Sequence, residues 1–597
     1  MNLKFQAQNL KHLFGLNKYF YKYRYRFILG IVFVVLSNVF RVLQPQVIRK
    51  ALDQILGYIQ TPVELRQPEV LSQSLTKFGL SIFIFAVLMG LFMFMMRQTI
   101  IVVSRLIEYD LRKVIFNHYI TLDTSFYKSN KTGDLMSRIV EDVNKVRMYL
   151  GPAMLYGINL LSIVLIVIIT MFQVNPMLSC YTLLPLPVLS YIIYLVSNKI
   201  NKQSELIQAQ LAGLTSQSQE SFSGVRILKS YGIESYWSKD FNDSAGQYKS
   251  HMMNLAKIDA MFFPSMLLLI GASTLITIYV GGLNVFEGRV TTGNIAEFVI
   301  YVTMLTWPVS AIGWCASIIQ QAEASQKRIN AFLQTSPSIR GGTHPLRLNH
   351  TPRVEFHQVS FRYPESGIQA LQNINIKIDS GQSIGIIGRT ASGKSSLTEL
   401  LLRMYDSTEG TITIDQRAVQ TIQLEYIRKL FSYVPQDSFL FSDTILENLR
   451  FGNPDLSQDE IEKYCQIAQI HEDIINFPHG YETLLGERGV NLSGGQKQRL
   501  CLARALAKKS RILLLDDCLS AVDAKTELNV LEHLKEGLEG RSLLLITQRI
   551  RQVQYMDYIY VMGEGNIIQE GTFNELLAIP GLFQTLYNIE NQNKYLE

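Results

Sequence analysis

The sequence predicts an all-α domain of six transmembrane helices with long intracellular helical extensions, followed by an α/β domain. Only 18% of the 597 residues are charged and 48% are hydrophobic, whereas an ordinary soluble protein carries roughly 25% charged residues. The missing charge is confined to long windows before residue 323. After Val354, short β-type runs alternate with helical stretches, which is typical of an α/β domain with a largely parallel sheet. We therefore expect a transmembrane domain over 1–325, a linker over 326–350 and the α/β domain over 351–597.

Composition excludes several other classes. A disordered chain would carry more charge and fewer aromatic residues than the 10% found here. The cysteines are scattered, odd in number and form no CxxC pair, which argues against a metal site or a disulfide framework. They are Cys180, Cys315, Cys465, Cys501 and Cys518. The net charge of +6 is accounted for by basic residues that flank membrane spans, so we expect no nucleic-acid partner.

The longest charge-free window covers residues 148–198, in which none of the 51 positions is Asp, Glu, Lys or Arg. One crossing needs about 20 apolar residues, so this window predicts two helices with a turn at 173–176. With the other apolar windows, the chain gives six spans. They are expected near 27–48, 78–100, 148–172, 176–198, 260–286 and 295–320.

Basic residues indicate how the spans are oriented. Four of them crowd the start of the first span, namely Lys18, Lys22, Arg24 and Arg26. The loop at 172–176 has none, so the positive-inside rule places the N-terminus in the cytoplasm. An even number of spans then leaves the C-terminus and the α/β domain there too. We expect an integral protein of a bacterial-type plasma (inner) membrane, in contact with its lipids.

Three basic residues near the outer end of the first span depart from this rule: Arg41, Arg49 and Lys50. Charged residues at membrane depth usually face a bundle interior or a water-filled cavity. We expect these side chains to face such a cavity or the membrane interface.

Two cytoplasmic stretches, 97–147 and 199–259, are too long for plain loops. Helices continuing out of the membrane fit them better, because 25 helical residues reach about 40 Å. The expected hairpins have their tips near 125–128 and 224–227, where a cytoplasmic surface has to receive them.

The α/β domain contains a phosphate-binding motif. The pattern GxxxxGK[ST] is matched in full by Gly388, Arg389, Thr390, Ala391, Ser392, Gly393, Lys394 and Ser395, with Ser396 following. An apolar strand precedes the motif and a helical stretch follows it, which is the context it requires. Backbone N–H groups at the helix N-terminus would hold the phosphates. Lys394 would reach the β and γ phosphates and Ser395 would bind Mg²⁺, so the motif predicts binding of ATP or GTP.

A second motif completes this prediction. The apolar run 512–515 ends in Asp516, a carboxylate that would hold Mg²⁺ through water. A buried strand often ends in Asp, so this motif indicates a nucleotide site only in combination with the phosphate-binding motif about 120 residues earlier.

The remaining motifs resemble those of ATP-binding cassette exporters. Leu492-Ser-Gly-Gly-Gln496 followed by Lys-Gln-Arg matches the signature of that family, and the resemblance extends over nearly the whole chain. It implies that Gln436 belongs to the Q-loop and contacts Mg²⁺, that Asp523 belongs to the D-loop, and that Tyr363 stacks on adenine. It also implies a coupling role for the hairpin tips, at Ser125, Phe126, Tyr127, Lys128, Gly224, Val225 and Arg226.

In this family two cassettes pair head to tail, so the signature of one chain closes on the ATP of the other. The resemblance therefore assigns Ser493, Gly494, Gly495 and Gln496 to the partner's ATP, and makes this chain half of a dimer. Two hydrolytic positions depart from the family pattern. Asp517 stands where the family has Glu, and Gln548 stands where it has a switch His.

These departures favour a site that binds ATP but hydrolyses it poorly. Asp is one methylene shorter than Glu, and a displacement near 1 Å can cost about 10²-fold in rate. Gln cannot carry the charge of a protonated His. We expect a heterodimer whose other chain holds the competent site. A slow homodimeric exporter and an ATP-gated regulatory or channel-like subunit are the alternatives.

The cargo is indicated only in outline. The last two spans contribute aromatic residues and few ionisable groups, with Phe262, Phe263, Tyr301, Trp307 and Trp314 as examples. Helix packing and interfacial belts account for most aromatic residues in such spans. A poorly charged cavity nonetheless favours amphipathic small molecules, drugs or lipids over ions and sugars.

Overall fold

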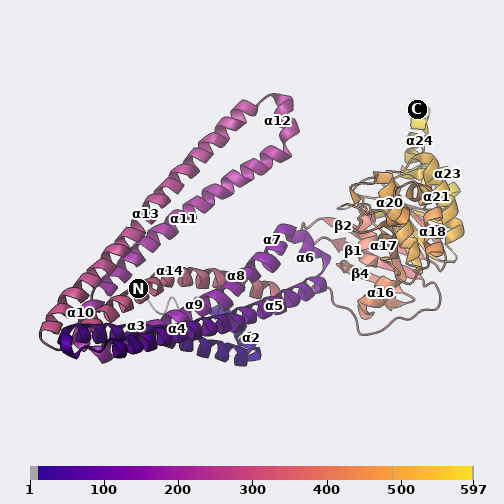
Figure 1. Cartoon of the computed structure of the whole chain (residues 1–597). Helices are drawn as coiled ribbons and strands as arrows, with labels where there is room; N and C mark the ends of the chain where they lie inside the picture. The colour runs from indigo at the N-terminus through magenta and orange to yellow at the C-terminus, as the bar shows by residue number, and fades with distance from the viewer. Residues whose placement is uncertain (1–10, 487–488, 539, 595–597) are drawn as a thin grey trace. The chain divides into compact units, whose positions relative to one another are not determined.

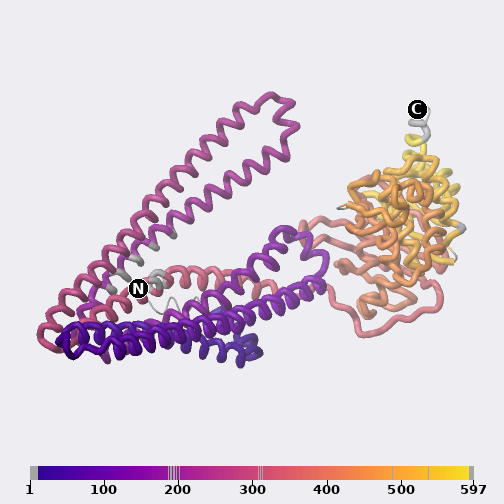
Figure 2. Tube along the Cα trace, viewed as in Figure 1, coloured from indigo at the N-terminus to yellow at the C-terminus, as the bar shows by residue number. Residues whose placement is uncertain are grey.

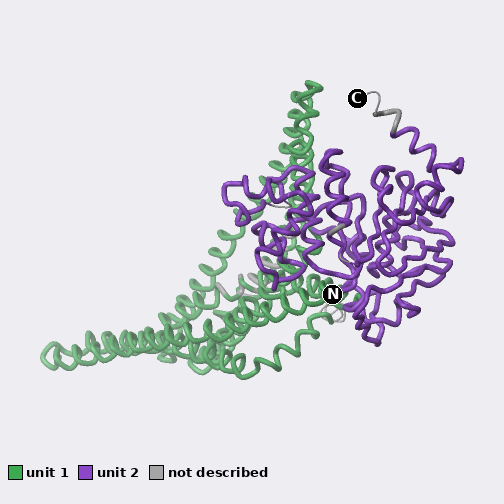
Figure 3. Tube along the Cα trace, turned by 90° about the vertical axis from the view of Figure 1, so that its right-hand side faces the viewer, with its two compact units in different colours: residues 1–120, 133–335 green, residues 121–132, 336–597 purple. Residues whose placement is uncertain are grey.

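The computed structural model describes residues 11–486, 489–538 and 540–594, which belong to two compact units (Figure 3). The first, here called the helical unit, consists of Met1–Ile120 and Gly133–Thr335. The second, the α/β unit, consists of Thr121–Thr132 and Ser336–Glu597. The predicted order of a helical domain followed by an α/β domain is confirmed.

The helical unit is built from long helices interrupted by short 3₁₀ and π segments (Figure 1). In chain order they are η1 (Lys11–Leu16), α2 (Asn17–Lys22), α3 (Arg24–Gln60), η2 (Val63–Leu65), α4 (Pro68–Met96), η3 (Arg97–Ile101), α5 (Val102–Thr121), α7 (Thr132–Ser137), η4 (Arg138–Asp142), α8 (Val143–Met148), η5 (Tyr149–Ala153), α9 (Met154–Val174), α10 (Pro176–Leu183), α11 (Pro185–Ser223), α12 (Val225–Tyr231), α13 (Glu234–Phe286) and α14 (Thr292–Gln334). The segments η3, η4 and η5 are π-helical.

Among the described residues, four helical segments are long and apolar enough to cross a membrane: Arg24–Gln60, Pro68–Thr121, Thr132–Val174 and Glu234–Phe286. The other two expected crossings, 176–198 and 295–320, lie in α10–α11 and α14. The turn expected at 173–176 is present. Asn175 accepts a hydrogen bond from the Leu178 N–H and so caps α10, and Pro176 takes the first helical position, where its missing N–H costs nothing.

The second hairpin is a pair of antiparallel helices, α11 and α13, joined at the tip by α12 (Figure 2). Near the tip, the indole of Trp237 donates a hydrogen bond to the hydroxyl of Ser221 at 2.5 Å. Gly224 caps the end of α11, and Val225 and Arg226 begin α12. The tip therefore lies at the residues expected from the sequence.

Helix α14 continues to Gln334, beyond the residue at which the linker was expected to begin. Its last turns still have partners in the helical unit, because Arg328 forms an ion pair with the buried Asp142 and Phe332 is buried. The helix ends where these contacts end and Pro337 follows.

The C-terminal part of α3 and the N-terminal part of α14 are joined by polar contacts. Arg49 forms an ion pair with the fully buried Glu297 at 3.1 Å. Asp53 accepts hydrogen bonds from the Gly293 N–H at 2.9 Å and from the hydroxyl of Thr291 at 2.8 Å. Arg49 therefore faces α14 inside the helical unit, where Glu297 neutralises its charge.

The α/β unit contains the short helix of the first hairpin tip together with the elements after residue 350. They are α6 (Thr124–Ser129), β1 (Val354–Arg362), β2 (Gln369–Ile378), β3 (Ser383–Gly388), α15 (Lys394–Leu401), β4 (Glu409–Ile414), β5 (Arg417–Ala418), η6 (Val419–Thr421), α16 (Leu424–Leu430), β6 (Phe431–Val434), α17 (Ile445–Arg450), α18 (Gln458–Ile467), α19 (His471–Ile475), η7 (Gly480–Glu482), α20 (Gly494–Ala507), β7 (Ile512–Asp516), α21 (Ala524–Gly537), β8 (Ser542–Thr547), α22 (Ile550–Val553), β9 (Tyr558–Gly563), β10 (Asn566–Gly571), α23 (Phe573–Ala578) and α24 (Leu582–Lys594).

The strands form two sheets. One has the order β10-β9-β3-β8-β7-β6 and is parallel except for the pair β10–β9. The other has the order β2-β1-β4-β5 and is antiparallel. The expectation that all the β-type runs join one largely parallel sheet is wrong for β1 and β4. Burial explains the division, because β7 and β8 are buried along their whole length whereas β1 alternates between buried and exposed residues.

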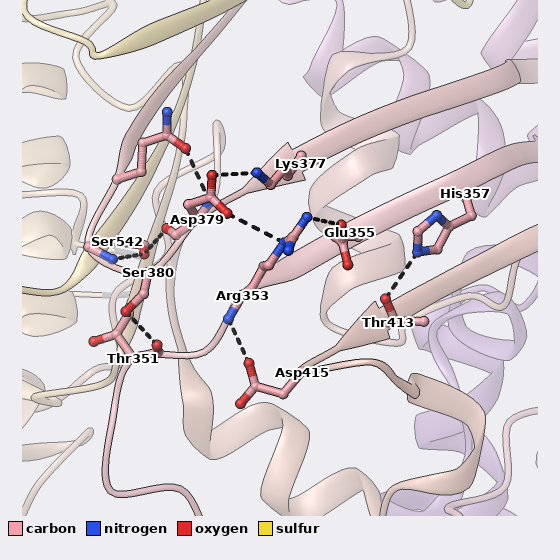
Figure 4. Close-up of polar contacts among 12 residues, drawn as sticks. Thr351, Arg353, Glu355, His357, Lys377, Asp379, Ser380, Thr413, Asp415 and Ser542 are labelled. Atoms are coloured by element: carbon pink, nitrogen blue, oxygen red, sulfur yellow. Dashed lines mark hydrogen bonds and ion pairs between the residues drawn. The ribbon is translucent and has the colours of Figure 1, made fainter.

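Polar contacts join the two sheets where β1 begins and β2 ends (Figure 4). The carboxylate of Asp379 lies 2.8 Å from the ammonium of Lys377 and 3.4 Å from the guanidinium of Arg353. The Arg353 N–H donates to Asp415 at 2.9 Å, and the hydroxyl of Ser542, at the start of β8, donates to the carbonyl of Asp379. These contacts hold the antiparallel sheet against the strands that carry the phosphate-binding motif.

Candidate ATP-binding site

The phosphate-binding loop connects the end of β3 to α15, as the motif predicts. Two glycines are required by its geometry. A Cβ on Gly388 would lie 2.4 Å from the carbonyl oxygen of Met562, and one on Gly393 would lie 2.3 Å from that of Ala370. Gly393 also has a φ of +94°, a conformation that glycine adopts without strain. The loop therefore lies directly against neighbouring backbone and presents its N–H groups at the start of α15.

A cavity of about 290 Å³ lies against this loop and collects residues from distant parts of the sequence. Its lining includes the predicted residues Tyr363, Thr390, Ala391, Ser392, Gly393, Lys394, Ser395, Ser396, Gln436, Asp516, Asp517 and Gln548. Ile368, Gln369, Ala370 and Ile546 complete the wall and had not been singled out from the sequence. Gly388 and Arg389 lie in the loop just before the lining residues.

Lys394 is almost fully buried at the base of the loop. Its ammonium donates hydrogen bonds to the carbonyls of Gly388 at 2.9 Å and Arg389 at 2.7 Å. Burial lowers the pKa of Lys394, while Asp517 and Asp516 act in the opposite direction. A buried cation beside two carboxylates and a row of N–H groups is suited to bind the anionic end of a nucleotide.

The three residues expected to hold Mg²⁺ meet in the structure. The hydroxyl of Ser395 donates to a carboxylate oxygen of Asp516 at 3.0 Å, and Gln436 lines the same cavity. A hydroxyl, a carboxylate and an amide oxygen are ligands that suit Mg²⁺, which commonly binds one or two carboxylates and completes its shell with water and substrate phosphates. The donor set therefore fits the ion.

Burial raises the pKa of Asp516 to about 6, and the neighbouring Asp517 adds to this effect, whereas the hydrogen bond from Ser395 opposes it. Because this pKa exceeds the ordinary 3.8, the folded chain keeps the proton to a higher pH than the unfolded chain does. The folded state consequently loses stability as pH rises from about 4 to 6, and the loss persists above pH 6.

We expect Asp516→Asn to stabilise the nucleotide-free chain at pH 8, because it removes this unfavourable charge. The difference between the two pKa values corresponds to about 3 kcal/mol. Differential scanning calorimetry of the full chain in lipid nanodiscs checks this at pH 8 and at pH 4, where the gain should vanish. Asp455→Asn, at an exposed position of the same unit, is the control. A lower unfolding temperature for Asp516→Asn at pH 8 would contradict the prediction.

Tyr363 also lines the cavity, although it lies before the loop in the sequence, directly after the end of β1. Its hydroxyl is hydrogen-bonded to Ser396 at 2.8 Å and donates to Glu399 at 2.8 Å. The ring packs edge to face against Phe361 and Tyr405. These contacts hold the aromatic ring at the cavity, where a nucleotide base could stack on it.

The two atypical positions also line the cavity. Asp517 follows β7 with a φ of +45°, and its N–H donates to the carbonyl of Ile546 at 2.8 Å. Burial raises the pKa of Asp517, and Arg549 and Lys394 oppose this effect. The amide oxygen of Gln548 accepts a hydrogen bond from the hydroxyl of Thr390 at 3.2 Å. Both side chains therefore lie beside the loop that would hold the γ-phosphate.

The signature residues are not part of this cavity lining. Ser493 caps α20, since its hydroxyl accepts from the Gln496 N–H and the Gln496 side chain accepts from the Ser493 N–H. Ser493 and Gly494 are exposed at the start of this helix. Asp523 is also outside the lining and caps α21 by accepting from the Thr526 N–H. An exposed helix start is suited to contact an anion from outside the chain.

A set of hydrogen bonds that sequence reasoning missed links the signature helix to the switch position. Gln498, in α20, donates to the hydroxyl of Ser520 at 3.0 Å and accepts from the Ala521 N–H at 2.9 Å. Arg549, which directly follows Gln548, donates to the Ser520 carbonyl at 2.7 Å and pairs with Glu527. The position of Arg549 next to Gln548 was the available signal for it.

The first hairpin tip belongs to the α/β unit and contacts the wall of the nucleotide cavity. The ammonium of Lys128 lies 3.1 Å from the carboxylate of Glu399 and about 5 Å from the ring centres of Tyr363 and Tyr405. Asp123 accepts from the Ser338 N–H at 2.6 Å. Glu399 and Tyr405 were not predicted, because only the fold brings them beside residue 128.

These features define an ABC transporter, with a membrane region and an ATP-binding region in one chain. Residues 27–309 match the model of the ABC transporter transmembrane region, and residues 371–520 match that of the ABC transporter ATP-binding region. With a relative that is 34% identical over 95% of this chain, the chain belongs to the ABC transporter family. It is an integral membrane protein and an ATPase coupled to transport, and the resemblance stated from its motifs is confirmed at this level.

That relative is the probable multidrug resistance ABC transporter ATP-binding/permease protein YheI of Bacillus subtilis (strain 168), of which 96% is covered. The multidrug resistance-like ATP-binding protein MdlA of Escherichia coli (strain K12) is 34% identical over 86% of this chain and 87% of its own length. Among solved structures, a bacterial Atm1-family ABC exporter with ATP bound has a TM-score of 0.77 at 23% identity, covering 95% of this chain and 98% of that chain. At 23% identity, the similarity to the Atm1-family exporter shows the fold alone.

Proposed function

We propose that the chain is one half of a heterodimeric, ATP-driven exporter whose own ATP site binds nucleotide but hydrolyses it poorly. The observation that carries this proposal is the composition of one cavity. Lys394, Ser395 and Asp516 retain the chemistry of nucleotide binding there, while Asp517 and Gln548 replace the two residues that serve hydrolysis in the family. Binding and hydrolysis are thus separated within a single site.

The two replacements act on the attacking water. A carboxylate at position 517 is one methylene shorter than Glu, and the Asp517 backbone is anchored to Ile546, so the missing length is not recovered locally. Gln548 can accept or donate a hydrogen bond, but its neutral amide cannot place a positive charge beside the γ-phosphate as a protonated His can. Bound Mg²⁺ would supply charge neutralisation at the phosphates, and Ser395 with Asp516 would hold it.

The signature residues Ser493, Gly494, Gly495 and Gln496 would then complete the competent site of the partner chain. The exposure of Ser493 and Gly494 at the start of α20 supports this role, because the anion they would bind comes from outside the chain. ATP held between two chains turns binding free energy into closure of the dimer. Hydrolysis at the competent site would release that closure, while the site of this chain stays occupied.

The movement of the closing ATP-binding domains has to be transmitted to the membrane helices through the hairpin tips. Residues 125–128 already pack in the α/β unit, through the contacts of Lys128 with Glu399 and the two tyrosines. At the tip of the second hairpin, Ile227 is 62% exposed and Tyr231 is 78% exposed. Large exposed apolar side chains mark contact surfaces, which supports a role for Gly224, Val225 and Arg226 in docking.

Cargo and direction follow from the relatives and the sequence. The names of the relatives include multidrug resistance, and the apolar spans favour an amphipathic small molecule or a lipid-like compound. The basic residues before the first span favour a cytoplasmic location for both termini and the ATPase, in a bacterial inner membrane. Export from the cytoplasm through the lipid bilayer is the resulting proposal.

The test is reconstitution of the purified chain in liposomes, alone and with candidate half-transporters encoded beside it. We expect the chain alone to bind ATP but to hydrolyse it slowly, and the pair to carry an amphipathic dye across the membrane in an ATP-dependent manner. Vigorous hydrolysis by the chain alone, abolished by Asp517→Asn, would instead establish a homodimer. ATP-dependent ion conductance without dye flux would establish a gate.

Lys128→Ala is expected to lower the number of cargo molecules moved per ATP hydrolysed about fivefold. The substitution removes an exposed ion pair, worth about 0.2–1 kcal/mol, and contacts with two aromatic rings, worth about 0.5–1 kcal/mol each. The hydrolysis rate itself should change little, because Lys128 does not line the nucleotide cavity. Dye flux and phosphate release in the same liposomes check this. Lys131→Ala, an exposed neighbour on the same tip, should leave the ratio unchanged, and an equal loss in both variants would contradict the coupling role.

A further inference from the structure

A second cavity, of about 170 Å³, lies inside the helical unit between α3, the end of α4, α9 and α14. Its polar lining consists of Ser37, Asn38, Arg41, Arg97, Tyr156 and Asn159, and the remaining wall is apolar, from Met93, Met96, Leu155 and Pro308. The cavity is smaller than the roughly 300–1,000 Å³ of a pocket that encloses a whole drug-sized molecule. It has room for the head group of a ligand.

The charged residues that line this cavity are all basic. Arg41 and Arg97 both line it, and none of the described residues that line it carries a carboxylate. Elsewhere in the helical unit, Arg49 pairs with Glu297 and Arg147 lies 3.7 Å from Glu108. The guanidinium groups of Arg41 and Arg97, in contrast, form no ion pair or hydrogen bond with any residue that the structure describes.

Both arginines interrupt membrane-spanning sequence. Arg41 ends the charge-free stretch 27–40 of α3, and Arg97 ends the charge-free stretch 78–96 of α4. Arg41 follows Arg26 by about 22 Å along the helix axis, and the hydrocarbon layer is about 30 Å thick. An arginine at such a depth is costly unless it faces a cavity or a partner, and for that reason usually marks a binding path.

Two π-helical turns adjoin the cavity. η3 begins at Arg97, and η5 ends just before Leu155 and Tyr156. The two segments are in contact, because a Cβ on Gly151 of η5 would lie 3.5 Å from the side chain of Ile101 in η3. A π turn redirects the side chains that follow it and is frequently found at functional sites. Arg97 is the first residue of one of these turns, and Tyr156 lies three residues after the other.

Further contacts order the remaining wall. The amide of Asn38 donates to Asn159 at 3.0 Å and to Ser162 at 2.6 Å, which joins α3 to α9. The ring of Tyr156 lies edge to face against Trp314 of α14, with 5.5 Å between the ring centres. The two arginines thus lie in a wall of ordered amides and aromatic rings.

We propose that this cavity binds the anionic head group of the cargo, a carboxylate, sulfonate or phosphate, while the apolar part of the cargo lies along the helices. The proposal rests on the export function proposed above and narrows its substrate class from amphipathic compounds in general to anionic amphiphiles. Guanidinium groups bind planar anions through paired, charge-assisted hydrogen bonds. Such bonds are stronger inside a membrane protein than in water.

The test uses the full chain in nanodiscs of zwitterionic phosphatidylcholine and a matched pair of fluorescent probes. The first probe is 11-(dansylamino)undecanoic acid, and the second is its neutral methyl ester. We expect the wild-type chain to bind the acid at least about tenfold more tightly than the ester. Arg41→Gln and Arg97→Gln should each remove most of this preference, and the Arg→Lys variants should keep part of it. Lys50→Gln removes a positive charge from the same helix outside the cavity and should retain the full preference.

Replacing part of the phosphatidylcholine with phosphatidylglycerol distinguishes two sources of the anion. Competition with the acid probe identifies an anionic lipid as cargo, and lack of competition identifies a free amphiphile. Thermal unfolding and ATP binding of each variant establish that it is folded. Equal binding of acid and ester to the wild-type chain, or an undiminished preference in the double variant Arg41→Gln/Arg97→Gln, would overturn the proposal. ATP-driven flux of a neutral dye, measured separately, would still support export if the charge preference were absent.

Discussion

Replacing Asp517 with Glu and Gln548 with His together is expected to raise ATP hydrolysis by the chain about 100-fold. Glu would add the missing methylene between the end of β7 and the attacking water, and the cost of misplacing a catalytic group by about 1 Å is near 10²-fold. His would add a group that can carry a positive charge beside Thr390, at the loop that holds the phosphates. The Mg²⁺ and phosphate ligands are already present in the same cavity.

This gain should be measured as steady-state phosphate release by the purified chain in nanodiscs assembled with two copies each, so that each copy can offer its signature to the other. Each single substitution should give a smaller gain than the pair. The positive φ at residue 517 is less favourable for Glu than for Asp, so thermal unfolding should be recorded alongside. Adding Lys394→Met to the double variant should abolish the gain. A double variant that is folded, binds ATP and hydrolyses no faster would refute the separation of binding from hydrolysis.

Lys394→Met is expected to weaken ATP binding to the chain by about 10²-fold or more. The ammonium is nearly buried at the base of the loop, and in the nucleotide complex it would form charge-assisted hydrogen bonds, each worth about 1.5–3 kcal/mol. Methionine preserves most of the side-chain volume but supplies neither charge nor donors. Equilibrium binding of a fluorescent ATP analogue, with Mg²⁺ present, measures the loss.

Lys508→Met is the matched control for this experiment. Lys508 is also a largely buried lysine, and its ammonium donates to the carbonyls of Arg428 at 2.8 Å and Phe431 at 2.7 Å. Burial lowers its pKa as it does that of Lys394. Because Lys508 does not line the nucleotide cavity, its replacement should alter stability without altering affinity. Equal losses of affinity in both variants would mean that Lys394 acts only through the fold.

Much of the nucleotide site could be predicted because its motifs are local. The loop around Lys394 and the strand before Asp516 each specify their own backbone and their own chemistry within a few residues. Charge-free windows likewise predicted the helices, since an apolar stretch of about 20 residues needs no distant partner to be helical in a membrane. The hairpin tips followed from the lengths of the segments between those windows.

Other features depend on contacts between distant residues. The antiparallel arrangement of β1 and β4 was missed, because alternating and continuous apolar runs were read as strands of one sheet. The partners of Lys128 lie about 240 to 280 positions away in sequence, at Tyr363, Glu399 and Tyr405. Arg549 and Gln498 are linked because both form hydrogen bonds with Ser520, in the loop between β7 and α21. No local pattern indicates such pairs.

The sequence by itself determined the order of the two domains, the nucleotide chemistry of the loop at 388–395 and the two atypical residues, Asp517 and Gln548. Each of these depends on residue type and short spacing. Only the tertiary structure decided that these two residues share a cavity with Lys394, that a hairpin tip contacts its wall, and that Arg41 and Arg97 face one space inside the helical unit. The physical reason is that burial and electrostatic environment come from packing between distant segments, so the same arginine can be a membrane anchor or part of a binding site.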